Sequence, residues 1–99
     1  MVQAEFHVTE KQFQRQILDL AHLMGWRSYH TWASIHTASG FPDLVLVRPP
    51  RCIFVEVKAS GRDPTPAQTE WLEALEQTAN EVYVWQPDDW PDIERTLRR

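Results

Sequence analysis

Residues 44–57 read Leu44-Val45-Leu46-Val47-Arg48-Pro49-Pro50-Arg51-Cys52-Ile53-Phe54-Val55-Glu56-Val57. Two short apolar runs, 44–47 and 53–57, flank a polar segment with two prolines, 48–52. Continuous apolar runs of this length are typical of strands that are covered on both faces. We therefore predict a β-hairpin with helices on both sides of it.

Sequence signals before and after the hairpin predict three helices and two further strands. Thr9 with Gln12, and Thr65 with Gln68, have the spacing of helix capping boxes, and Gly25 supplies a helix stop. The expected elements are, in chain order, a helix over 9–24, a strand over 27–32, the hairpin, a helix over 65–79, a strand over 82–85 and a helix from Asp88 or Asp89 to Leu97. This order indicates an α/β sandwich around a mixed sheet.

Composition and length predict one compact domain over residues 1–99. The chain has 42% hydrophobic and 24% charged residues, which is typical of a globular domain. Its single cysteine, Cys52, cannot form an intramolecular disulfide, which favours a reducing compartment. Neither a secretory signal nor a run of about eighteen apolar residues is found. We expect a cytoplasmic protein without a membrane partner.

The formal net charge of -4 speaks against a polyanionic partner. This objection weakens if some of the carboxylates hold a divalent cation, because the bound ion presents a positive centre to phosphate. The charge balance therefore leaves nucleic acid open as a partner.

Three ionisable residues lie in or beside the two apolar strands: Asp43, Glu56 and Lys58. If residues 49–52 form a four-residue loop, Val45 pairs with Glu56 and Asp43 pairs with Lys58. The side-chain period of two then puts all three ionisable residues on one face of the hairpin. A slip of one residue would separate Asp43 from the other two.

Two carboxylates that converge at the end of a sheet are oxygen ligands suited to Mg²⁺ or Mn²⁺. A lysine on the same strand face can orient or deprotonate a water, or stabilise charge that develops on phosphorus. Glu10 extends the inward-facing stripe of the first helix and is a third candidate ligand. These residue types fit a metal-assisted attack of water on phosphorus.

Gly40-Phe41-Pro42-Asp43, followed by Glu56-Val57-Lys58, resembles the signature of PD-(D/E)XK nucleases. More closely, residues 40–47, residues 55–58, the upstream Glu10 and Thr65-Pro66-Ala67-Gln68 resemble the VRR-NUC family, in the small stand-alone form typical of phages. The resemblance covers roughly residues 9–86 and most of the expected elements.

The resemblance implies a restriction-endonuclease-like α/β/α sandwich and a DNA endonuclease that depends on Mg²⁺ or Mn²⁺. It implies that Glu10, Asp43, Glu56 and the carbonyl of Val57 are metal ligands. It further implies that Lys58 is the catalytic lysine and that Gln68 belongs to the catalytic set. Stand-alone members resemble Holliday-junction resolvases, so we expect a homodimer that acts on branched DNA in a bacterium or a phage-infected cell.

Two other functions stay open. One is a monomeric nickase or flap nuclease with the same site, and the other is a catalytically silent nucleic-acid-binding module. The intact Asp43, Glu56 and Lys58 argue against the silent module, because a decayed site is expected to lose at least one of them.

Several candidate residues also have purely structural interpretations. Glu10 can favour the helix dipole, and Gln68 can serve only as the third residue of its capping box. Asp43, Glu56 and Lys58 can form cross-strand ion pairs. His30 and His36 flank the expected site without a ligand spacing.

Large apolar groups near the termini and the ends of elements are candidates for a dimer contact. Trp71 and Trp85 lie on faces expected to be core. The candidates for an exposed association patch are Phe6, Val8, Trp26, Trp32 and Trp90. The simpler interpretation is that these side chains close off the core.

Overall fold

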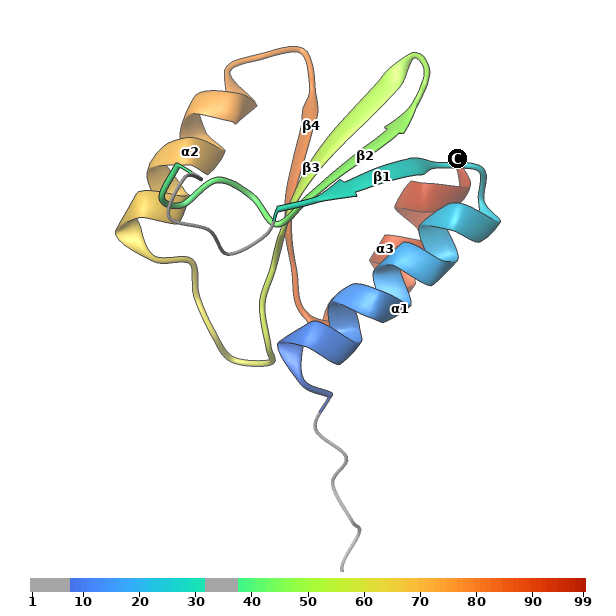
Figure 1. Cartoon of the computed structure of the whole chain (residues 1–99), viewed down its shortest axis with the longest axis horizontal. Coiled ribbons are helices and arrows are strands. Elements are labelled where there is room, and N and C mark those ends of the chain that lie inside the picture. The colour runs from blue at the N-terminus through green and yellow to red at the C-terminus, as the bar shows by residue number, and fades with distance from the viewer. Residues whose placement is uncertain (1–7, 32–37) are drawn as a thin grey trace, which may run out of the picture.

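The computed structural model describes residues 8–31 and 38–99. A four-stranded sheet lies between helices α1 and α3 on one face and helix α2 on the other (Figure 1). The elements are α1 (Glu10–Leu23), β1 (Arg27–His30), β2 (Leu44–Arg48), β3 (Arg51–Val57), α2 (Pro66–Glu76), β4 (Glu81–Trp85), the 3₁₀ turn η1 (Pro87–Asp89) and α3 (Trp90–Arg98). The predicted α/β sandwich is confirmed.

The sheet has the strand order β1-β2-β3-β4. The pairs β1–β2 and β2–β3 are antiparallel, whereas β4 runs parallel to β3. A parallel neighbour needs a crossover, and α2 supplies it between β3 and β4. The sheet is therefore mixed, as predicted.

The hydrophobic core lies between the sheet and the pair α1 and α3. Phe13 and Ile17 of α1 are fully buried there, and so are Ile93 and Leu97 of α3. The strands contribute the residues that alternate toward this face, which are Leu44, Leu46, Ile53, Val55 and Val57. The opposite face of the hairpin is left for Asp43, Glu56 and Lys58.

The register of the hairpin differs from the predicted one by two residues. Arg48 pairs with Arg51 and Val45 pairs with Phe54, so only Pro49 and Pro50 form the turn. The predicted partner of Val45, Glu56, is therefore wrong. The faces are nevertheless as predicted, because a shift of two residues preserves the alternation of side chains.

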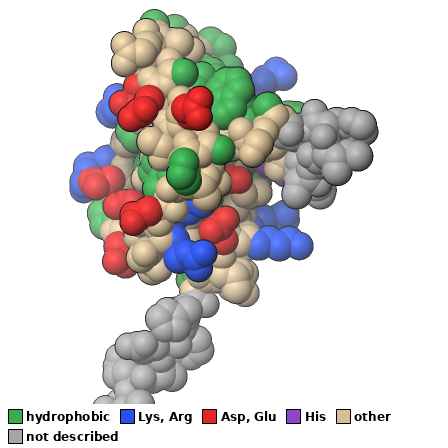
Figure 2. All heavy atoms as spheres, turned by 90° about the vertical axis from the view of Figure 1, so that its left-hand side faces the viewer, with side chains coloured by type: hydrophobic (Ala, Val, Ile, Leu, Met, Phe, Trp, Pro, Cys, Tyr) green, Lys and Arg blue, Asp and Glu red, His purple; other side chains and the backbone are tan. Residues whose placement is uncertain are grey.

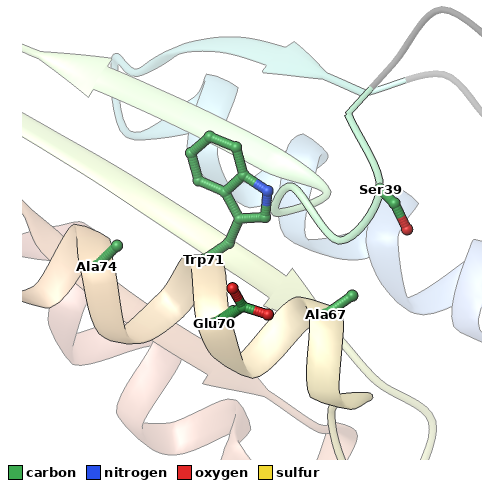
Figure 3. A pocket seen from close by; sticks show the side chains of 5 residues that line it. All are labelled: Ser39, Ala67, Glu70, Trp71 and Ala74. Carbon is green, nitrogen blue, oxygen red and sulfur yellow. The ribbon is translucent and has the colours of Figure 1, made fainter.

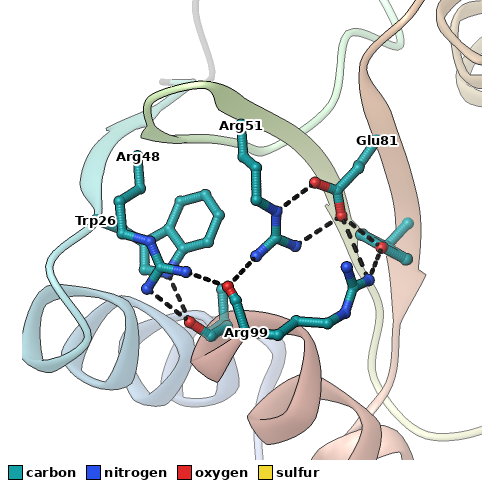
Figure 4. Close-up of polar contacts among 7 residues, drawn as sticks. Trp26, Arg48, Arg51, Glu81 and Arg99 are labelled. Carbon is teal, nitrogen blue, oxygen red and sulfur yellow. Dashed lines mark hydrogen bonds and ion pairs between the residues drawn. The ribbon is translucent and has the colours of Figure 1, made fainter.

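Arg48 and Arg51 pair at the end of the hairpin, and both guanidinium groups lie over one indole. Their Cζ atoms lie 4.5 and 4.9 Å from the ring centroid of Trp26. Figure 4 shows this arrangement, in which Arg48 also donates to Leu97 O and Arg51 is paired with Glu81. These cation–π contacts favour an ordered strand end.

The prediction of an exposed association patch is wrong for those candidate residues that the structure describes. Trp26 is only 3% exposed, and its indole N–H donates to the main-chain oxygen of Leu97. Val8 and Trp90 are partly buried against the core. Phe6 and Trp32 lie outside the described residues. The described candidates therefore close off the core, as the simpler interpretation holds.

Several element ends also differ from the prediction. The first strand ends at His30, and its predicted last residue, Trp32, lies outside the described residues. Helix α2 ends at Glu76, so Ala79 is exposed beyond it rather than on its apolar face. The side chain of Asp89 accepts from Gln86 N instead of capping α3.

Within the described ranges, no helix is long and apolar enough to cross a membrane.

Candidate active site

Asp43 lies directly before β2 and joins the two neighbouring strands. Its side-chain Oδ2 accepts a hydrogen bond of 2.8 Å from Val57 N on β3. Its main-chain oxygen accepts a hydrogen bond of 2.8 Å from Thr31 N at the end of β1. Extending the β2–β3 register by one residue places Asp43 opposite Glu56, and not opposite Lys58 as predicted.

Glu56 is the most unusual carboxylate in the described part of the chain. Its residue is 1% exposed, and in the charged form neither carboxylate oxygen has a hydrogen-bond donor among residues 8–31 and 38–99, whereas the protonated form can donate to the carboxylate of Asp43. A buried carboxylate without donors is costly in its charged form. Such a group favours either a proton or a cation.

The pKa of Glu56 is raised to about 8 in the absence of a metal ion. Burial is the largest cause, and the nearby charge of Asp43 is the next. Lys58 opposes the shift, and Glu10 adds to it from α1. The free site is therefore expected to hold a proton near neutral pH.

Lys58 follows β3 and is itself almost buried, with 9% exposure. Its Nζ lies 3.7 Å from Glu56 Oε2. Its main-chain N–H donates to Trp85 O over 2.9 Å, which extends the β3–β4 pairing by one step. The structure thus brings Asp43, Glu56 and Lys58 together at the open end of the hairpin, away from the Pro49-Pro50 turn.

The structure supports the expected metal-ligand roles of Glu10 and Val57 less directly. Glu10 is exposed in the first turn of α1, and it reaches Glu56 through its charge. Within the two described ranges, no three His, Cys, Asp or Glu side chains are grouped closely enough to hold an ion. Val57 has its side chain in the core and its N–H on Asp43. The assignments of Glu10 and of the Val57 carbonyl as ligands stay predictions.

Gln68 makes the contacts of a capping residue. Its Oε1 accepts from Thr65 N over 2.8 Å, and its main-chain N donates to Thr65 Oγ1 over 3.2 Å. These contacts account for the residue at this spacing. A catalytic role for Gln68 stays a prediction.

The segment 40–43 is fixed to α2 by a close backbone approach and by aromatic packing. Gly40 has a φ of +87°, and a Cβ there would come within 2.5 Å of the Ala67 carbonyl group, so only glycine fits. The Phe41 ring centroid lies 5.0 Å from that of Trp71 and 6.1 Å from that of Phe54, both in edge-on contact. The Gly-Phe-Pro motif, which we call the support of the site, therefore joins the segment that carries Asp43 to α2.

A shallow hollow of about 300 Å³ lies beside this support. Trp71 rises from α2 toward the sheet, and Ser39 faces the same space from the loop before Gly40 (Figure 3). The sequence predicted Trp71 as a core residue, which is wrong because it is only half-buried and lines this hollow. The alternation that puts Phe54 on the same strand face as Glu56 is a sequence signal that could have linked the aromatic contacts to the site.

The strand register places His30 on a different face of the sheet from Asp43. In the β1–β2 pairing His30 lies opposite Leu44, on the core face. His36 lies outside the described residues.

The side of the molecule that carries α2 displays acidic side chains prominently (Figure 2). On α2 itself Glu70, Glu73 and Glu76 are all exposed. Phosphate groups are repelled by such a surface. A polyanion is therefore expected to reach the hairpin end without lying across the outer face of α2.

A mixed sheet between helices, with a carboxylate pair and a lysine at one strand end, defines a restriction-endonuclease-like sandwich. Residues 2–88 match the VRR-NUC domain family, and the chain belongs to this family. It is a nuclease-type family, so DNA is the implied class of substrate. The resemblance seen in the sequence is confirmed.

A solved structure described as a VRR_NUC domain protein is similar to the chain. The TM-score is 0.72 at 19% sequence identity, and the alignment covers 94% of this chain and 88% of that chain. At this identity the likeness shows a shared fold. No protein of curated function matches the chain.

Proposed function

We propose that this protein is a divalent-metal-dependent DNA endonuclease that cuts branched DNA as a homodimer. The observation that carries the proposal is the buried carboxylate of Glu56, which lies next to Asp43 and Lys58 and, when charged, has no hydrogen-bond donor among the described residues. A structural ion pair alone would leave this carboxylate poorly compensated. Membership of a nuclease family supports the interpretation of this arrangement as a catalytic site.

The residues present fit a hard divalent cation. Asp43 and Glu56 offer carboxylate oxygens, and Glu10 supplies further negative charge nearby. Mg²⁺ and Mn²⁺ prefer oxygen ligands of this kind. When bound, such an ion supplies a Lewis acid for the phosphate and lowers the pKa of water.

The chain's own groups have separate tasks in this proposal. Asp43 and Glu56 hold the cation, and the Glu56 proton must leave before they do so. Lys58 Nζ, close to Glu56, orients the attacking water or takes its proton. The loop from Gly40 to Pro42 keeps Asp43 in position.

Cleavage is expected to require Mg²⁺ or Mn²⁺ and to stop in excess EDTA, because the described residues offer only carboxylates and a lysine at this point. The test is a panel of labelled DNAs, comprising a four-way junction, a flap, a nicked duplex and an intact duplex, incubated with each metal. Preferential cutting of the junction supports the proposal. Undiminished cleavage in EDTA contradicts metal dependence, and equal cutting of every DNA contradicts the structural preference.

A dimer is expected because resolution of a four-way junction needs two symmetric incisions, whereas one chain carries one site. Light scattering at micromolar concentration measures the mass. A value near twice 11.6 kDa is the expected result. A monomer that makes single nicks in a cruciform plasmid would reject the junction-resolving dimer and leave a nickase or flap nuclease.

A further inference from the structure

We propose that Thr31 is a positioning residue that fixes the backbone on both sides of Asp43. The inference rests on the proposed function, because it assigns Thr31 a part in holding the Asp43 carboxylate for catalysis. Thr31 follows the last residue of β1 and is half-buried.

One residue makes two hydrogen bonds to consecutive main-chain oxygens. Thr31 N donates to Asp43 O over 2.8 Å, and Thr31 Oγ1 donates to Pro42 O over 2.9 Å. The first bond continues the β1–β2 ladder beyond the His30–Leu44 pair. The second bond depends on the side chain, so a hydroxyl is needed at this position.

The two oxygens belong to the two peptide planes that meet at the Asp43 Cα. The carbonyl of Pro42 is in the plane before this atom, and the carbonyl of Asp43 is in the plane after it. Fixing both planes restricts both backbone dihedrals of Asp43. The direction of its Cβ, and hence of its carboxylate, is then set by Thr31 together with the Val57 N–H that binds Oδ2.

Loss of the hydroxyl would leave the oxygen of Pro42 without this donor. Pro42 is fully buried, and a buried carbonyl that loses its partner is costly. Rotating the peptide plane toward another donor relieves this cost but turns Asp43 with it. The neighbouring contacts of Gly40 and Phe41 with α2 involve the Gly40 Cα position and an aromatic ring, and not the Pro42 carbonyl.

The test compares Thr31→Val and Thr31→Ser with the wild-type protein, using cleavage of the preferred DNA in Mn²⁺. Valine keeps the shape and removes the hydroxyl, so kcat is expected to fall about 10- to 100-fold with little change in KM. Serine keeps the hydroxyl and is expected to restore kcat to near the wild-type value. The matched control is Thr78→Val, which removes another hydroxyl-to-carbonyl bond, at the far end of α2.

A calorimetric Mn²⁺ titration gives a readout that a merely structural role would not change. Thr31→Val is expected to bind Mn²⁺ more weakly, and Thr31→Ser to bind it normally. If Thr31→Val fails to fold, Thr31→Cys keeps a weaker donor, and an intermediate kcat is expected. Wild-type kcat and Mn²⁺ affinity in a folded Val or Cys variant would overturn the inference, even if its melting temperature were lower.

Failure of this inference differs from failure of the proposed function. A wild-type protein that cleaves no DNA with any metal contradicts the function itself. An active wild-type protein whose Thr31→Val variant is equally active contradicts only the role of Thr31.

Discussion

Lys58→Met is expected to lower DNA cleavage about 100- to 10,000-fold, the range for loss of a positioned proton-transfer group. Methionine keeps the length of the almost buried side chain, so the fold is retained. The ammonium group near Glu56 is removed. Single-turnover cleavage under saturating Mn²⁺ measures the loss.

Metal binding by the same variant is expected to survive at higher pH. Lys58 lowers the pKa of Glu56, so its removal raises that pKa further and shifts the pH at which Mn²⁺ binds upward. Lys11→Met is the matched control, because Lys11 is the other lysine of the chain and is exposed on α1. A Lys58→Met enzyme with the wild-type rate would refute the assigned role.

Glu56→Gln is expected to abolish metal binding and cleavage while stabilising the metal-free protein at pH 8. In the wild-type protein the folded state keeps the Glu56 proton up to a pKa of about 8, whereas an unfolded chain releases it near pH 4. The folded state therefore binds more protons in this window. The contribution of Glu56 to stability is full below the unfolded pKa and is lost as pH rises toward 8.

Thermal unfolding in EDTA between pH 5 and pH 8.5 measures this effect. The wild-type melting temperature is expected to carry a downward slope over this range that Glu56→Gln lacks, because glutamine imitates the protonated carboxyl. Added Mn²⁺ is expected to raise the wild-type melting temperature more at pH 8 than at pH 6, and to leave the variant unchanged. Glu76→Gln, an exposed carboxylate on α2, is the control. Identical pH slopes for the wild-type protein and Glu56→Gln would contradict the assignment.

The sequence was sufficient to predict the faces of the hairpin but not its turn. Alternation of side chains is local, so Glu56 and Lys58 share a face whatever the turn length. The two residues that flank the turn, Arg48 and Arg51, both lie over the indole of Trp26. Trp26 is far from both arginines in sequence, so a local sequence pattern does not predict this contact.

The contacts that hold the site in place could not be predicted from local sequence patterns either. Thr31 was expected in a strand, and its contact with Pro42 depends on how β1 pairs with β2. The burial of Trp26 depends on the Leu97 carbonyl at the other end of the chain. Residue type and spacing were therefore enough to name the candidate groups Asp43, Glu56 and Lys58, whereas the contacts that hold them follow from tertiary pairing.

The hydrogen bond from Val57 N to Asp43 Oδ2 makes one backbone amide a spectroscopic reporter of the site. Amide proton shifts respond to the charge and distance of their acceptor, and a carboxylate acceptor gives a short, strong bond. Any event that draws charge from Asp43 therefore changes the shift of this N–H. In a ¹H–¹⁵N spectrum of the ¹⁵N-labelled protein, the Val57 cross-peak thus reports on this carboxylate without substrate or turnover.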